Sequence, residues 1–369
     1  MAGYLLPDSA QLRTIKLLAY RVCRALGLFG VARTLTRRGL RILCYHGFSL
    51  QDESDFRPGL FILPETFAER MQYLASNGYP VLSLQQGIAG LDAKRLPPNA
   101  VVITIDDGFY GVSAMAAPIL KTHNFPATLY VTSYYAIKKT PIFRLALQYI
   151  FWKTTAETLD TAALDLPLPR AVLPLTADDK HRVMWDIIRF GETDLDEASR
   201  VTLARTLGQR LGVDYDALDA SRCVSLLSGD ELRQLPASGI DIQLHTHRHH
   251  LPEERTLVER EVTENRAFLA TVTATPLTHF CYPSGIWSER HWPSLAALGV
   301  ETATTCEPGL NSPSTPRLSL HRFLDGEDIT QIEFEAEVSG FTELLRSVRN
   351  GFHLYSTDSM DTLPARSNA

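Results

Sequence analysis

Cysteine is scarce in this sequence, and several familiar sequence signals are missing. Its five cysteines are odd in number, scattered and never spaced C-x-x-C, so a disulfide framework is not expected. No apolar run approaches the roughly 18 residues that cross a bilayer, and no basic segment leads into an apolar core as in a secretory signal. No glycine-rich phosphate loop follows a strand-like run, which argues against dinucleotide binding. We therefore expect a cytoplasmic protein.

Acidic residues are missing from one stretch of a chain that is acidic as a whole. The net charge of −6 and the pI of about 6.0 argue against a nucleic-acid partner. Between Ser9 and Arg41, however, eight basic residues occur without a single acid. Apolar residues recur there at the spacing of an amphipathic helix, namely Ile15, Leu18, Val22, Leu26 and Phe29.

Two interpretations of this basic N-terminal region, residues 1–40, stay open. In the first, its helix packs on the outside of the domain and its basic face is solvated. In the second, it makes peripheral contact with an anionic membrane, which for a cytoplasmic protein is the inner membrane face.

Strand-like and helix-like patterns alternate over residues 41–330. The strand-like runs are 41–45, 79–84, 100–105, 127–132, 240–244, 278–282, 300–305 and 318–323. The helix-like runs between them are 64–76, 111–123, 253–272 and 288–298. This alternation predicts an α/β fold, a distorted (β/α) barrel of TIM type with about seven parallel strands. An open doubly wound sheet is the alternative.

The alternation stops between residues 133 and 228. This segment is predicted to be a helical insertion that covers the core or shapes a cleft. Residues 331–369 are expected to form a C-terminal helix and a polar tail, disordered from about Thr357.

Two adjacent acids follow the strand-like run 100–105. Chemistry in parallel α/β folds takes place at the carboxyl ends of strands, where Asp106 and Asp107 stand. Successive side chains of a strand point to opposite faces, so these acids share a site only if the chain bends. Gly108 gives the chain the freedom to bend there. An ordinary turn or helix cap is the alternative interpretation.

Four of the eleven histidines fall within six residues, after the strand-like run 240–244. Two histidines and one carboxylate, with coordination positions left open, form a catalytic metal site. His245, His247 and His249 would share one face if the strand continued, so the spacing leaves the ligands undecided. A solvated basic loop is the alternative.

Two further strand ends carry weaker signals. Residues 280–285 (FCYPSG) end a strand in a sharp turn, which is either functional or a plain proline turn. His46 follows the strand-like run 41–45, but a lone histidine at such a place is more often structural.

Taken in this order, the motifs resemble those of the NodB-homology polysaccharide deacetylases, carbohydrate esterase family 4. ITIDDG is similar to the TFDDG motif of that family, with Ile105 in place of phenylalanine. HTHRH resembles its H-S/T-x-x-H motif, and CYPSG its R-x-P-Y-G motif. The YHG element resembles one in bacterial poly-N-acetylglucosamine-type deacetylases. The resemblance covers residues 42–324 except the insertion.

The resemblance implies roles for five residues. Asp106 would be the general base, and Asp107, His245 and His249 would bind a divalent metal, Zn²⁺ in the first place and Co²⁺ or Ni²⁺ as alternatives. The backbone N–H of Ser284 would face the oxyanion.

The general acid and the motif arginine are less directly implied. Members of the family carry the acid histidine either near the C-terminus, which points to His321, or at the YHG element, which points to the favoured His46. Cys281 stands where the family has an arginine that orients the base, and Arg322 is a candidate substitute.

The expected function is therefore metal-dependent removal of N-acetyl or related acyl groups from a carbohydrate, in exopolysaccharide or cell-surface glycan metabolism. The expected substrate is an N-acetylated carbohydrate or a lipid-linked glycan. The missing arginine motivates one alternative, a carbohydrate-binding protein with impaired catalysis. A 2-His-1-carboxylate Fe(II) enzyme is another alternative.

Overall fold

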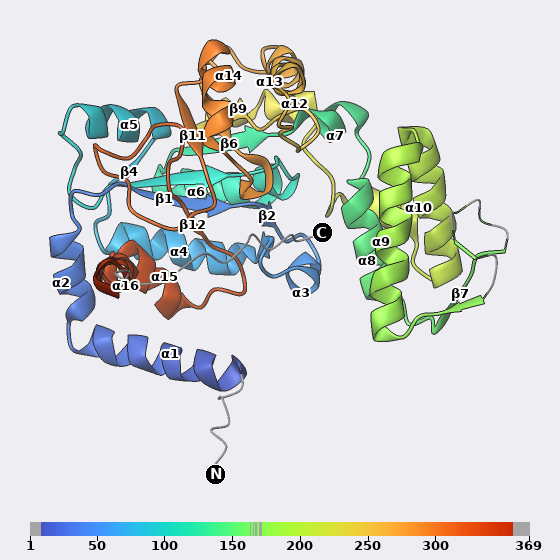
Figure 1. The fold of residues 1–369 in the computed structure, drawn as a ribbon, viewed down its shortest axis with the longest axis horizontal. Coiled ribbons are helices and arrows are strands. Elements are labelled where there is room, and N and C mark those ends of the chain that lie inside the picture. Colours follow the sequence, from blue (N-terminus) through green and yellow to red (C-terminus); the bar gives the residue numbers. More distant parts are fainter. Residues whose placement is uncertain (1–8, 163, 165, 167, 170–171, 357–369) are drawn as a thin grey trace, which may run out of the picture.

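A curled parallel sheet forms the centre of the protein (Figure 1). The computed structural model describes residues 9–162, 164, 166, 168–169 and 172–356, so the expected tail from Thr357 lies outside the described residues. The strand order is β11-β10-β9-β6-β5-β1-β12, with β4 beside β5, and every pairing in this sheet is parallel. The strands are β1 (Arg41–Tyr45), β4 (Val81–Leu82), β5 (Val101–Ile105), β6 (Ala127–Val131), β9 (Ile240–Leu244), β10 (His279–Cys281), β11 (Thr302–Thr304) and β12 (Phe323–Leu324).

The sheet is buried on both faces. Every side chain of β1, β5 and β6 is buried, which explains why these strands are continuous apolar runs. The segment before β12 returns to β11, because Leu320 pairs with Thr304 and its N–H donates to the carbonyl of Ala303. The predicted distorted TIM-type barrel is therefore confirmed.

Helices cover the outside of the sheet. They include α4 (Pro64–Ser76), α5 (Leu84–Asp92), α6 (Ala117–His123), α12 (Gly229–Leu232), α13 (Arg255–Leu269) and α14 (Trp292–Ala297). Sequence explains their starts: Pro64 occupies the first turn of α4, and Ser83 with Gln86 forms a capping box at α5. A small pair of parallel strands, β2 (Gly47–Phe48) and β3 (Phe61–Ile62), and the short helix α3 (Glu53–Phe56) follow β1.

The helix after β5 begins as a π-helix over Val112–Ala116, which the sequence did not predict. Pro118 lacks the N–H that an α-helix would donate to the carbonyl four residues earlier, and a wider turn accommodates that gap.

The segment 133–228 forms a helical layer beside the barrel (Figure 1). Its helices are α7 (Ser133–Lys138), α8 (Phe143–Lys153), α9 (Ala177–Asp194), α10 (Glu197–Leu211) and α11 (Tyr215–Ser221). Leu147, Ile150, Ile187 and Leu207 belong to its own apolar cluster, separate from the barrel core. An antiparallel pair that was not predicted, β7 (Thr158–Asp160) and β8 (Val172–Pro174), completes the segment.

The terminal helices pack together on one side of the barrel. They are α1 (Ser9–Ala25), α2 (Leu28–Leu35), α15 (Gln331–Val338) and α16 (Phe341–Ser356). Helix α1 packs on the outside of the domain, as the first interpretation expected. The expected solvated basic face is wrong, because Lys16 and Arg24 pair with α15 and the apolar residues Ile15, Leu18 and Val22 are exposed. None of the described helices is both long and apolar enough to span a membrane.

Candidate metal and catalytic site

The end of β5 turns sharply and brings two acids into one site. Asp107 and Gly108 both have positive φ, 70° and 92°, so the extended chain stops directly after Asp106. A positive φ is unfavourable for a residue with a Cβ, so the surrounding structure must hold Asp107 in this conformation. Asp106 and Asp107 are both buried.

The loop after β9 coils back on itself. Thr246 and His249 have positive φ, 63° and 55°, which ends the strand and breaks the alternation of its side chains. As a result, the Nε2 atoms of His245 and His249 lie 3.3 Å and 3.2 Å from the Oδ1 atom of Asp107. The ligand-type atoms of these three residues all lie within 4.8 Å of one another.

This cluster fits a divalent cation. The Nδ1 atom of His245 lies 2.8 Å from the carbonyl oxygen of Cys281, which can only accept, so Nδ1 carries the proton and Nε2 of the neutral ring is a lone pair. That lone pair faces the Oδ1 atom of Asp107, which is buried without a hydrogen-bond partner among the described residues. Two acceptors this close repel each other unless positive charge lies between them.

The distances agree with a tetrahedral site. Ligands at about 2.0–2.1 Å from a tetrahedral zinc are separated by about 3.3 Å, close to the two distances in this cluster. Electrostatics agrees too: burial favours the neutral ring of His245, but its interactions with the side chains of Cys281 and Asp107 raise its pKa well above the usual value. The site therefore favours a positive charge.

Asp106 is held by a buried arginine, Arg322, from the segment directly before β12. The Nη1 and Nη2 atoms of Arg322 lie 2.7 Å and 2.8 Å from the two carboxylate oxygens of Asp106. Burial raises the pKa of Asp106, but Arg322 outweighs burial and holds it well below its usual range. Asp106 is therefore ionised and oriented.

The comparisons with known proteins agree with this geometry. The model of the family described as polysaccharide deacetylase matches residues 207–303, which contain the histidine cluster and the turn after β10. Curated protein sequences give no match. Residues 207–303 are therefore similar to the polysaccharide deacetylase family.

Solved structures with a similar fold cover most of the chain. The deacetylase PplD of Streptococcus pyogenes, in complex with acetate, has 17% identity and a TM-score of 0.53, and the match covers 81% of this chain and 98% of that one. IcaB from Ammonifex degensii has 18% identity and a TM-score of 0.51, over 82% and 97%. A de-N-acetylase from Aggregatibacter actinomycetemcomitans has 16% identity and a TM-score of 0.50, over 80% and 98%.

The match to this family model supports a hydrolase of carbon–nitrogen bonds other than peptide bonds. Within this fold, Arg322 contacts Asp106, the residue that the missing motif arginine was expected to orient. Cys281, which stands in the position of that arginine, has its Sγ atom 3.2 Å from both Asp106 Oδ2 and Arg322 Nη2.

The two candidate acid histidines lie in different surroundings. His46 Nε2 is 3.8 Å from Asp106 Oδ2, and its ring is partly exposed. His321 does not join the cluster: its Nδ1 atom lies 3.9 Å from Glu307 Oε2. Neighbouring side chains of an extended segment point in opposite directions, so Arg322 points inward and His321 points away.

Ser284 lies in the turn after β10 with a left-handed φ of 56°, and it is exposed. The following residue, Gly285, is packed so closely against Cys306 that a Cβ there would lie 2.8 Å from its Sγ atom. This close approach fixes the turn beside the Arg322 side chain, to which Cys306 Sγ lies 3.9 Å away.

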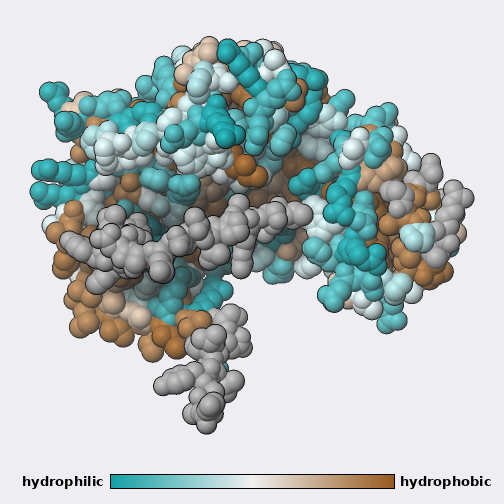
Figure 2. Space-filling model, viewed as in Figure 1, coloured by the Kyte–Doolittle hydropathy of each residue, from teal (hydrophilic) through white to brown (hydrophobic). Residues whose placement is uncertain are grey.

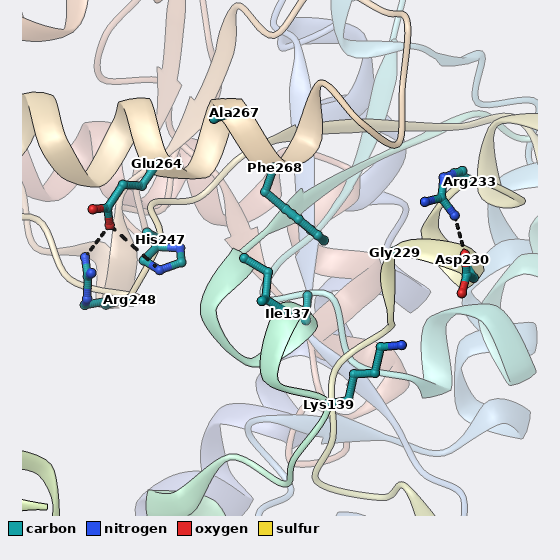
Figure 3. A pocket seen from close by; sticks show the side chains of 11 residues that line it. Ile137, Lys139, Gly229, Asp230, Arg233, His247, Arg248, Glu264, Ala267 and Phe268 are labelled. Atoms are coloured by element: carbon teal, nitrogen blue, oxygen red, sulfur yellow. Dashed lines mark hydrogen bonds and ion pairs between the residues drawn. The ribbon is translucent and has the colours of Figure 1, made fainter. Parts of the chain in front are cut away.

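His247 and His250 lie in the same histidine-rich loop but do not belong to the cluster. His247 Nδ1 lies 2.8 Å from Ser133 Oγ, and its Nε2 atom faces Glu264. Figure 3 shows His247 and Arg248 directed at Glu264 along the wall of a cavity of about 690 Å³. This cavity contains no residue of the proposed metal cluster, so it lies outside the site.

Helix α13 holds the histidine loop, which the sequence analysis missed. Asn265 Oδ1 accepts the N–H of His245, and its Nδ2 atom donates to the carbonyl of Val131. Glu261 accepts the N–H groups of both His247 and Arg248. The sequence could have revealed this role, because Asn265 is a polar residue on the apolar stripe of α13. A polar group buried there is tolerated only if it forms hydrogen bonds.

Proposed function

We propose that this chain is a metal-dependent deacetylase that removes N-acetyl groups from a carbohydrate of the exopolysaccharide or cell-surface glycan class. The observation that carries the proposal is the juxtaposition of two sets of residues. Asp107, His245 and His249 converge as a ligand set, and the neighbouring Asp106 is held ionised by Arg322. A pure binding protein has no need of the second acid.

The reaction follows from the charges of these residues. A divalent cation held by Asp107, His245 and His249 would supply polarisation of the acyl carbonyl and a more acidic water. Asp106 accepts the proton of the attacking water, because it is ionised and next to the ligand set. The backbone N–H of Ser284 is the proposed donor to the oxyanion.

His46 is the proposed general acid. Its Nε2 atom lies 3.8 Å from Asp106 Oδ2, its ring is partly exposed, and it can take a proton from solvent before delivering it to the departing amine. Without that proton, expulsion of an amine is slow.

An acetyl group is the acyl group proposed to be removed, because of two of the solved structures with a similar fold. One is described as a de-N-acetylase, and another was solved with acetate. A lipid-linked glycan is the proposed alternative to a free oligosaccharide, because a membrane contact, argued below, would bring the site to such a substrate.

Metal replacement tests the proposal. The full chain is stripped of metal and assayed for acetate release from N-acetylated oligosaccharides, with Zn²⁺, Co²⁺ or Ni²⁺ added back and bound metal measured. We expect one equivalent of metal and restored acetate release. Stoichiometric metal without release from any N-acetylated glycan would contradict the proposed reaction.

Variants separate the base from the ligands. Asp106→Asn is expected to keep one equivalent of metal and to lose acetate release by at least about 10²-fold. His245→Gln and His249→Gln are expected to lose metal. His250→Gln, at an exposed position directly after the motif, is the matched control and is expected to keep both. Unchanged turnover in the Asp106 variant would remove this residue from the mechanism.

A further inference from the structure

Helix α1 turns its charged side toward the protein and its apolar side toward solvent. Lys16 Nζ lies 2.8 Å from Glu333 Oε1, and Arg24 Nη1 lies 2.9 Å from Glu335 Oε2, both on α15. Between these ion pairs, Leu17, Tyr20 and partly buried Cys23 pack against the small apolar cluster under α1. The inner side of α1 therefore already holds the helix against the rest of the protein. The other apolar residues of α1 take no part in that contact.

The outer side forms a continuous apolar surface over two helices. Eight large apolar side chains are exposed there, by between 39% and 70%. We call them the α1–α2 surface: Leu12, Ile15, Leu18, Val22, Leu26, Leu28, Val31 and Leu35. Figure 2 shows hydrophobic side chains gathered over α1 and α2, at the edge of the molecule away from the insertion. Scattered exposed leucines are ordinary, but a contiguous patch marks an interaction site.

Basic residues border this surface. Arg21 on α1 and Arg37 and Arg38 directly after α2 are exposed, and none of them forms an ion pair within the described part of the chain. No acid occurs between Ser9 and Arg41, although the whole chain has a net charge of −6. Positive charge is thus concentrated at the border of the apolar patch.

We propose that the α1–α2 surface docks this protein on an anionic phospholipid bilayer. Helix α1 lies in the plane of the bilayer, its outer side chains enter the boundary between headgroups and acyl chains, and Arg21, Arg37 and Arg38 contact lipid phosphates. The sequence suggested membrane contact by this basic region without assigning it to one side of the helix. The structure assigns the contact to the apolar side, because Lys16 and Arg24 already pair with α15.

Charge favours a bilayer over a second copy of the chain. A symmetric dimer through this surface would place the same unpaired arginines of both copies around one interface, where like charges repel. An anionic bilayer instead offers an apolar layer below a plane of negative charge. The shape agrees, since α1 is a nearly straight rod about 25 Å long that projects at the edge of the molecule.

Vesicle co-sedimentation of the full chain tests this docking. The vesicles contain either phosphatidylglycerol with phosphatidylcholine or phosphatidylcholine alone. One variant carries Ile15→Gln, Leu18→Gln and Val22→Gln, which keep the charge and the helix propensity. The matched control carries Ile137→Gln, Val172→Gln and Leu257→Gln, three exposed apolar positions elsewhere. A third variant replaces Arg21, Arg37 and Arg38 by glutamine.

We expect the wild type to bind anionic vesicles and the first triple variant to bind at least about tenfold more weakly, while the matched control binds like the wild type. The arginine variant should lose the preference for anionic vesicles and the salt dependence. Absence of wild-type binding, or equal binding of both apolar triples, would overturn the proposal. The proposal would also be overturned if the wild type formed a dimer, did not bind vesicles, and became a monomer only in the first triple variant. In that case the α1–α2 surface would bind a second copy of the chain. Acetate release from soluble oligosaccharides is independent of these outcomes, because the α1–α2 surface contains no residue of the site.

Discussion

At the scale of single residues, the site depends on a small side chain making room for a large one. Cys281 and Arg322 both contact the Oδ2 atom of Asp106, so an arginine at position 281 would compete with Arg322 for the same carboxylate. The short thiol leaves that position to a guanidinium that comes from the segment before β12. Orientation of Asp106, the proposed base, thus comes from a residue far from the motif in sequence.

Arg322→Lys should damage turnover more than metal binding. Lysine keeps the charge, but it cannot form two parallel hydrogen bonds, so Asp106 loses its fixed orientation. Misplacement of a catalytic group by about 1 Å costs on the order of 10²-fold in rate. We expect kcat to fall by about that factor with KM and bound metal nearly unchanged, measured by acetate release and metal analysis. A variant that loses metal instead would show that Arg322 acts on the ligand set.

A pair of histidine variants can decide whether His46 or His321 is the general acid. His46→Gln should lower kcat by about 10²–10⁴-fold, because the departing amine is no longer protonated. His321→Gln should leave kcat within a few-fold, since its ring faces Glu307 rather than Asp106. An ester substrate is the informative control, because an alkoxide leaves more easily than an amine and the loss in the His46 variant should shrink. The reverse ranking of the two variants would assign the acid to His321.

At the scale of elements, one helix fixes the geometry of the histidine loop. Asn265 is fully buried and connects α13 to the ends of β6 and β9 through Val131 and His245. Glu261, one turn earlier, caps the two N–H groups at the loop centre. These bonds support the positive φ of Thr246, a β-branched residue for which this conformation is costly.

Asn265→Ala tests this support. Its removal leaves the N–H of His245 and the carbonyl of Val131 buried without partners, at about 1–3 kcal/mol for each group. We expect the free energy of unfolding to fall by about 2–4 kcal/mol and metal affinity to fall about 10–100-fold, since the loop would no longer hold His245 in place. Chemical denaturation and competitive metal titration measure the two effects. Thr263→Ala, at an exposed position of the same helix, should change neither.

Sequence reasoning succeeded where a feature depends on local pattern. The apolar runs predicted β1, β5, β6 and β9, and the reactive side chains do stand at strand ends. Spacing could not choose between His247 and His249, and only the family resemblance pointed to His249. The choice depends on the φ of Thr246 and His249, which no propensity of threonine or histidine reveals. The orientation of α1 was missed for a similar reason: α1 has apolar residues on two sides, and only the acids of α15 decide which side faces inward.

At the scale of the whole molecule, a buried ion pair joins the two ends of the barrel domain. Arg70 on α4 donates through Nε to Asp325 Oδ2 at 3.2 Å and through Nη2 to the carbonyl of Ile329. Tyr45 at the end of β1 donates to the same carboxylate oxygen at 3.0 Å. The last strand, β12, ends directly before Asp325, so this pair holds the closing segment of the sheet beside β1.

Removal of this ion pair should destabilise the protein in a pH-dependent way. Burial raises the pKa of Asp325 to about 6, although Arg70 and Tyr45 oppose it. This value is above that of the unfolded chain, about 3.9. The native state therefore binds more protons than the unfolded state between about pH 4 and pH 6, and this group makes stability fall as pH rises through that window.

Arg70→Leu leaves the carboxylate without its cation, so the pKa of Asp325 rises further. We expect the variant to lose about 3–5 kcal/mol of unfolding free energy at pH 8, where Asp325 would be buried and ionised, and clearly less at pH 5, where it is protonated. Urea unfolding of wild type and variant at both pH values measures the difference. A loss of equal size at the two pH values would show that Asp325 does not change its protonation between them, and that Arg70 stabilises the barrel only through packing and its bonds to residues 329–331.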